Sequence, residues 1–160
     1  MNSTNQTTPI NDTYALFESH IREGFNLLKI KPLSIETGIR RYHLPTFANP
    51  SEDFELRVEF PGATCIIGFG QSEVYTDYGF FYSSVNFERQ GQPPLYLKHY
   101  LADRKDQRKE SLRFSDTEFT LEEGISRIVE VLVALFNNEL NPLLAGLTWI
   151  TAPFDWEGYK

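Results

Sequence analysis

The chain has 160 residues, a hydrophobic fraction of 41% and a charged fraction of 23%, values that are typical of one globular domain. Its net charge is −7, whereas a surface that binds nucleic acid or anionic membrane needs clustered Lys and Arg. The acidic balance therefore argues against both of these partners and suits a basic one.

The cysteine content and the first residues indicate the compartment. Cys65 is the single cysteine, which excludes an internal disulfide and fits a reducing environment. The N-terminal residues lack the basic start and apolar run of a signal peptide. No stretch approaches the ~18 apolar residues of a membrane span. We therefore expect a soluble, cytoplasmic protein.

A first helix is predicted near the N-terminus. Residues 1–10 are polar, so we expect a flexible N-terminus followed by a single domain over residues 11–160. The helix is expected to start near Asn11–Thr13 and to end at Pro32. Apolar residues recur at helical spacing in this segment and form one stripe: Tyr14, Phe17, Ile21, Phe25 and Leu28.

The clearest strand covers residues 54–60, where apolar and polar residues alternate without error. A weaker strand is predicted before it, over residues 35–43. In the clear strand the alternation places Glu55 and Glu59 on the solvent side. These two carboxylates are therefore candidates for contact with a partner.

A turn at residues 61–62, Pro-Gly, joins this strand to a second one over residues 63–69. The register that keeps the apolar residues on one face pairs Val58 with Cys65 and Leu56 with Ile67.

Further strands are predicted over residues 74–78, 80–88, 95–102 and 112–114, with a charged, exposed connection over 103–110. In the strand over 95–102, alternation would place His99 on the face of the leucines.

A second helix is predicted from Thr120, where Glu123 completes a capping box, to the Asn-Pro pair at residues 141–142. Residues 143–160 are expected to be irregular or to form one short strand. The fold class is therefore α+β: a mostly antiparallel sheet of about five to six strands flanked by an N-terminal and a C-terminal helix.

The residues that could carry chemistry favour a binding protein over an enzyme. His20, His43 and His99 lack the spacing of a metal site. Cys65 is expected in the core, where a thiol is unreactive. The Gly-Phe-Gly at residues 68–70 lacks the rest of a phosphate-binding loop. The sequence thus predicts no catalytic residue, no cofactor and no metal.

The C-terminal segment combines aromatic and acidic residues, which suits an interface with a basic protein. The alternative, which we favour for the aromatic residues, is that the segment packs back on the sheet and closes the core. The candidate partner-binding residues are Glu55, Glu59, Trp149, Asp155, Trp156, Glu157 and Tyr159.

Small, acidic, cytosolic α+β proteins without catalytic motifs are typical of bacterial immunity proteins, which neutralise a toxin by occluding it. This comparison concerns organisation alone and transfers no site. The hypothesis is a protein that is not an enzyme and that occludes a basic partner, possibly a cognate toxin. Two alternatives stay open: a ligand-binding or enzymatic domain with a pocket between sheet and helix that contains His99, and a secretion chaperone.

Overall fold

The computed structural model describes residues 4–42, 51–71 and 80–153 of the chain. These residues form one six-stranded antiparallel sheet in the order β1-β2-β3-β4-β5, in which β6 pairs with β4 beside β5. The strands are β1 (Ser34–Tyr42), β2 (Ser51–Glu59), β3 (Thr64–Gln71), β4 (Phe80–Glu88), β5 (Leu95–Tyr96) and β6 (Arg113–Ser115).

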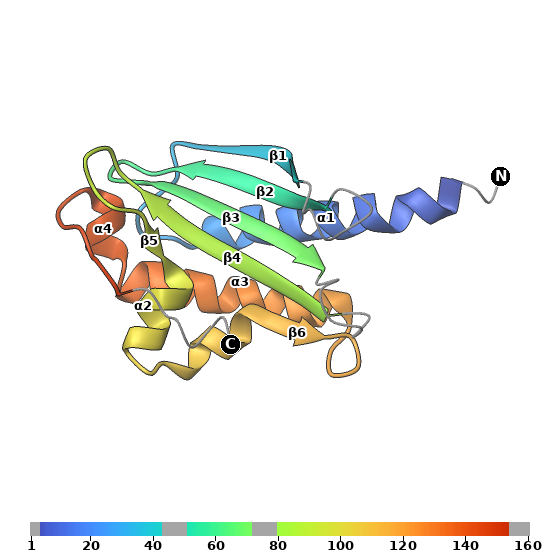
Figure 1. Cartoon of the computed structure of the whole chain (residues 1–160). Coiled ribbons are helices and arrows are strands. Elements are labelled where there is room, and N and C mark those ends of the chain that lie inside the picture. The colour runs from blue at the N-terminus through green and yellow to red at the C-terminus, as the bar shows by residue number, and fades with distance from the viewer. Residues whose placement is uncertain (1–3, 43–50, 72–79, 154–160) are drawn as a thin grey trace.

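Two long helices cover one face of this sheet, α1 (Thr4–Phe25) and α3 (Leu121–Asn138), and they contact each other (Figure 1). The predicted fold class is therefore confirmed: the chain is α+β, with an antiparallel sheet and helices in its N-terminal and C-terminal regions. Neither these helices nor any other described one is long and apolar enough to cross a membrane.

The predicted register of β2 and β3 is confirmed. Val58 pairs with Cys65 and Leu56 pairs with Ile67, and all four side chains are fully buried. The weaker strand predicted over 35–43 is β1, which pairs with β2 along its whole length. The strand predicted over 74–78 lies outside the described residues.

The apolar stripe of α1 packs on the sheet and on α3 as the spacing predicted. Phe17 stacks on Phe69, with 4.3 Å between ring centroids, and Phe25 contacts Phe136 at 5.5 Å. The predicted ends of this helix are wrong, because it begins at Thr4 and ends at Phe25. Leu28 is nevertheless buried, because the tight turn after the helix directs it into the core.

The strand predicted over residues 95–102 is wrong beyond Tyr96. Residues Leu97–Asp103 form the helix α2. Three of its buried residues, Leu97, Tyr100 and Leu101, have the i, i+3, i+4 spacing of one helix face. The segment thus contains both a strand-like alternation and a helical spacing of apolar residues, and the structure follows the helical one.

Two further connections are helical. The predicted exposed connection contains the 3₁₀ helix η1 (Gln107–Leu112), which the Asp106 carboxylate caps by accepting a bond from the Arg108 N–H. The predicted stop at Asn-Pro instead starts α4 (Asn141–Ala145), because Pro is well suited to the first turn of a helix.

The capping box of α3 is confirmed. The Glu123 N–H donates to Thr120 Oγ1 at 3.2 Å, and the Thr120 N–H donates to Glu123 Oε1 at 3.0 Å. The hydrogen bond that the carboxylate accepts from the Thr120 N–H, assisted by the Thr120 hydroxyl, lowers the pKa of Glu123.

The β2–β3 turn is locked against α4. The Gly62 N–H donates to the Leu144 carbonyl at 2.7 Å. Arg89 donates from Nε to the Gly62 carbonyl at 2.6 Å and from Nη2 to the Leu143 carbonyl at 2.9 Å. A side chain at position 62 would collide with the backbone of Gly146, so glycine is needed for this close approach.

Candidate functional site

The sheet has one face that no described helix covers, the face opposite α1 and α3 (Figure 1). We call it the open face. Cross-strand pairing arranges its residues in rows, of which three lie where the side chains are described. The first row is Glu36, Arg57, Ile66, Asn86 and Tyr96. The second row is Gly38, Glu55, Gly68 and Ser84, and the third is Ser34, Glu59, Thr64 and Glu88.

Acidic side chains dominate the charge of these rows. Glu36 and Glu88 are exposed, and Glu55 and Glu59 are half-buried, whereas Arg57 is the single cation of the three rows. Thr64 Oγ1 donates to Glu59 Oε2 at 2.7 Å and orients that carboxylate. The predicted solvent-side position of Glu55 and Glu59 is thus confirmed.

The open face also offers an aromatic side chain and little steric obstruction. Tyr96 stands at the end of the first row and is 41% exposed. Its ring contacts that of His99 edge-on, with 5.4 Å between centroids. In the second row, the exposed Gly38 leaves the backbone accessible to a partner. Tyrosine is a favoured anchor in protein interfaces.

Trp149 contributes to the fold at another place. Its Nε1–H donates to the Pro93 carbonyl at 3.1 Å, and the Arg89 guanidinium lies 4.8 Å from the centre of its ring. The half-buried indole therefore connects the C-terminal segment to the β4–β5 turn and to the residue that locks α4. These contacts agree with the alternative that the aromatic residues of the C-terminal segment pack back on the fold.

The four other C-terminal candidates, Asp155, Trp156, Glu157 and Tyr159, lie outside the described residues.

The cysteine and the described histidines lie in different parts of the molecule. Cys65 is fully buried, and burial raises the pKa of its thiol well above the ordinary value. His99 is buried in α2. His20 Nε2 lies 3.8 Å from Glu122 Oε2, between α1 and α3, and His43 is not among the described residues. Groups of three or more His, Cys, Asp or Glu side chains that could hold a metal are absent from the described part of the chain.

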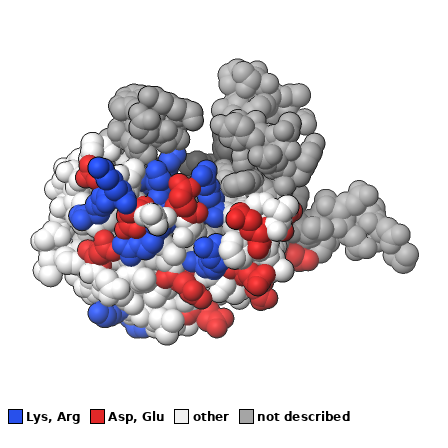
Figure 2. Space-filling view, turned by 90° about the horizontal axis from the view of Figure 1, so that it is seen from below, with Lys and Arg blue, Asp and Glu red and all other residues white. Residues whose placement is uncertain are grey.

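The side of the molecule that carries α2 and η1 has a different charge pattern. Figure 2 shows basic and acidic side chains interleaved there. Arg108 Nη2 bonds both Asp106 Oδ2 and Glu139 Oε2 at 2.5 Å, and the Tyr100 hydroxyl donates to Glu139 Oε1 at 3.2 Å. The hydrogen bonds from Arg108 lower the pKa of Asp106. This cluster ties η1 to α3, and the sequence pattern did not indicate it.

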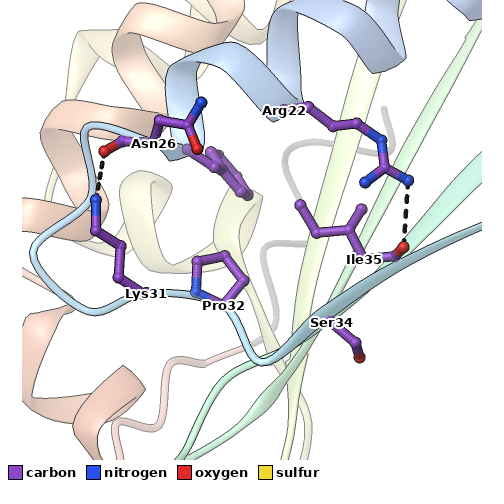
Figure 3. Close-up of a pocket in the computed structure, with 7 residues that line it drawn as sticks. Arg22, Asn26, Lys31, Pro32, Ser34 and Ile35 are labelled. Carbon is purple, nitrogen blue, oxygen red and sulfur yellow. Dashed lines mark hydrogen bonds between the residues drawn. The ribbon is translucent and has the colours of Figure 1, made fainter.

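One shallow hollow of about 270 Å³ lies where the chain passes from α1 to β1 (Figure 3). Apolar atoms of Phe25, Pro32 and Ile35 line it, and the cations Arg22 and Lys31 stand at its rim. Both cations bind the protein itself. Arg22 donates to the Ile35 carbonyl at 3.2 Å, and Lys31 donates to the Asn26 carbonyl. The hollow does not include His99, so it is not the pocket that the ligand-binding alternative required.

Comparison of the chain with protein-family models, with curated proteins and with solved structures finds no match.

Proposed function

We propose that the protein is a binding protein whose open face occludes a basic protein partner, as a bacterial immunity protein occludes its toxin. The observation that carries this proposal is the set of four carboxylates, Glu36, Glu55, Glu59 and Glu88, that three neighbouring rows of that face bring together.

The spacing of these carboxylates suits joint attraction of a cationic surface. Neighbouring strands are about 4.8 Å apart, so Glu59 and Glu88, separated by β3, have backbones roughly 10 Å apart. This separation is close to the Debye length of about 8 Å at physiological salt. The carboxylates therefore act together on an approaching partner, and their effect is expected to weaken as salt rises.

The affinity would come from groups that a partner can desolvate. Ile66 and Asn86 are half-buried at the centre of the first row, and Tyr96 closes its end. Bound Lys or Arg side chains would pair with the carboxylates around this centre. Specific protein interfaces usually combine an aromatic anchor with charged residues around it.

The test is titration with the product of the gene adjacent to the one that encodes this chain. The variant Glu55→Lys/Glu88→Lys reverses two charges on the open face, and Glu118→Lys/Glu130→Lys reverses two exposed charges elsewhere. Both variants change the net charge equally. A difference in their association rates would therefore come from the position of the charges on the open face. We expect the first to slow association at least about tenfold and the second to change it far less. Equal behaviour of the two variants, or the absence of binding by the unmodified chain, would refute the proposal.

A further inference from the structure

β1 is a long strand at the margin of the sheet. It forms nine residue pairs with β2 without interruption, and among the described residues no other strand pairs with it. In Figure 1 it forms the upper edge of the sheet. The opposite margin differs, because β4 is covered there by the short strands β5 and β6.

Hydrogen bonding shows which groups of β1 point away from the sheet. Phe60 and Ala63 exchange two backbone hydrogen bonds, so the even-numbered residues of β2 bond toward β3. The odd-numbered ones therefore bond toward β1, where their partners are Ser34, Glu36 and Gly38.

The odd-numbered residues of β1 consequently direct their N–H and C=O groups off the edge. The bond from Arg22 Nη2 to the Ile35 carbonyl agrees with this direction, since that oxygen is reached from outside the sheet (Figure 3). A second strand could therefore pair with residues 37, 39 and 41, and at residue 35 it would replace the exposed Arg22 as the partner of the carbonyl.

Several devices that usually prevent pairing at an exposed edge are missing from β1. Its sequence, Ser-Ile-Glu-Thr-Gly-Ile-Arg-Arg-Tyr, has no Pro, its register with β2 has no bulge, and it is not short. It does carry charges at positions 36, 40 and 41, so a second strand can pair with it only where these charges are matched. A straight edge of this length is a template for such a strand.

We propose that this edge binds a second copy of the chain, through antiparallel pairing of β1 with β1 about a two-fold axis at Gly38. The outward groups pair only when odd-numbered residues meet odd-numbered residues, so the axis passes through a residue position. An axis at Gly38 pairs Thr37 with position 39 of the other copy and Ile35 with position 41.

Charge favours this register. An axis at position 37 or 39 also lets odd-numbered residues meet, but it places Glu36 opposite Gly38 or position 42 and forms no opposite-charge pair. With the axis at Gly38, Glu36 faces Arg40 of the second copy, and symmetry makes this opposite-charge pair twice. The β2 partners of positions 36 and 40 are positions 57 and 53, so the register positions across the joined sheets would follow the order 57, 36, 40, 53, whose residue types alternate in charge. An axis at position 36 or 40 would instead place like charges opposite each other, which is unfavourable.

The axis position itself is free of obstruction. Residues that face each other there form a pair without mutual hydrogen bonds, with Cα atoms about 4.5 Å apart. Gly38 is exposed, and a Cβ added to it meets nothing within 4 Å. Two copies can therefore approach at this point.

Disulfide trapping tests the register directly, because a Cα separation of about 4.5 Å lies within the range that a disulfide spans. We expect Gly38→Cys to form a covalent dimer under mild oxidation. The matched control, Ser84→Cys, places an exposed cysteine on the open face of β4 and should stay monomeric. Cys65 is buried and does not compete. If Gly38→Cys cross-links no faster than Ser84→Cys, the proposed axis is wrong.

A charge exchange tests the same register without oxidation. Sedimentation of the unmodified chain should show a dimer, and Glu36→Arg or Arg40→Glu alone should shift it to monomer. An equimolar mixture of these two variants should form the dimer again, because each then meets opposite charges. The control Glu88→Arg should stay dimeric. An unmodified chain that stays monomeric at high concentration, or single variants that remain dimers, would overturn the proposal.

Discussion

Replacement of Gly62 by alanine is expected to destabilise the protein strongly for so small a change. The added methyl group would meet the backbone of Gly146, and backbone cannot rotate away as a side chain can. Relief requires the β2–β3 turn to move from α4, which would weaken the bond from Gly62 N–H to Leu144 and the bonds of Arg89 to both segments. Overpacking costs about 1–3 kcal/mol, and each weakened hydrogen bond adds about 1 kcal/mol. With three such bonds, we expect a loss of roughly 4–6 kcal/mol in the free energy of unfolding.

Urea denaturation followed by circular dichroism measures this loss. Gly91→Ala is the control, since Gly91 has a φ of +83° and open space around it. That substitution carries only the cost of a left-handed backbone, about 1–2 kcal/mol. If Gly62→Ala costs no more than Gly91→Ala, the β2–β3 turn is not locked against α4 as described.

Three further changes test other parts of the fold. Leu56→Ala should lower the free energy of unfolding by about 2–5 kcal/mol in a urea melt, because Leu56 is fully buried between β1 and β3; a loss below about 0.5 kcal/mol would place Leu56 at the surface. Trp149→Phe should cost about 1 kcal/mol through loss of the bond to Pro93, and an unchanged melting temperature would contradict that contact. The pKa of Asp106 is held below its ordinary value of 3.8, chiefly by hydrogen bonds from Arg108. Its stabilising contribution is therefore present above that pH and is lost as the pH falls through the folded-state pKa, so Asp106→Asn should make the acid decline of the melting temperature shallower; parallel declines would exclude this role.

The β2–β3 hairpin was predictable because its determinants are local. Alternation over residues 54–60 specifies one buried face, and the turn at residues 61–62 fixes which residues meet. The ends of α1 were not predictable in this way. Asp12 and Thr13 are good capping residues, but the helical backbone continues through both to Thr4.

The segment after β5 shows how two periodicities can coexist in one short stretch. Leu95, Leu97, His99 and Leu101 alternate as in a strand, and all four are buried. Burial of Tyr100 breaks this alternation and belongs to the helical pattern of α2. A segment of seven residues is too short for periodicity alone to decide, and here packing against β4 and η1 decides it.

The candidate site was predictable only in the part that lies on one strand. Alternation places Glu55 and Glu59 on the solvent side, but it does not say which strands lie beside them. Glu36 and Glu88 join them because β1 and β4 are neighbours of the central strands β2 and β3, and that order is set by pairing between distant segments. The same non-local pairing leaves β1 at the margin of the sheet. The strand order therefore determines both the acidity of the open face and the exposure of the β1 edge.

Composition alone does not distinguish an aromatic residue that packs on the fold from one that remains accessible. Trp149 was a candidate because tryptophan and acidic residues occur together in the C-terminal segment, yet its Nε1–H and its ring are both engaged by the β4–β5 turn. Tyr96 had no such signal, since the predicted strand gave it no distinct role. Its position at the end of β5 leaves it 41% exposed beside the carboxylate rows. An anchor is defined by what remains accessible after the core has formed, and Tyr96 meets that condition on the open face better than Trp149 does.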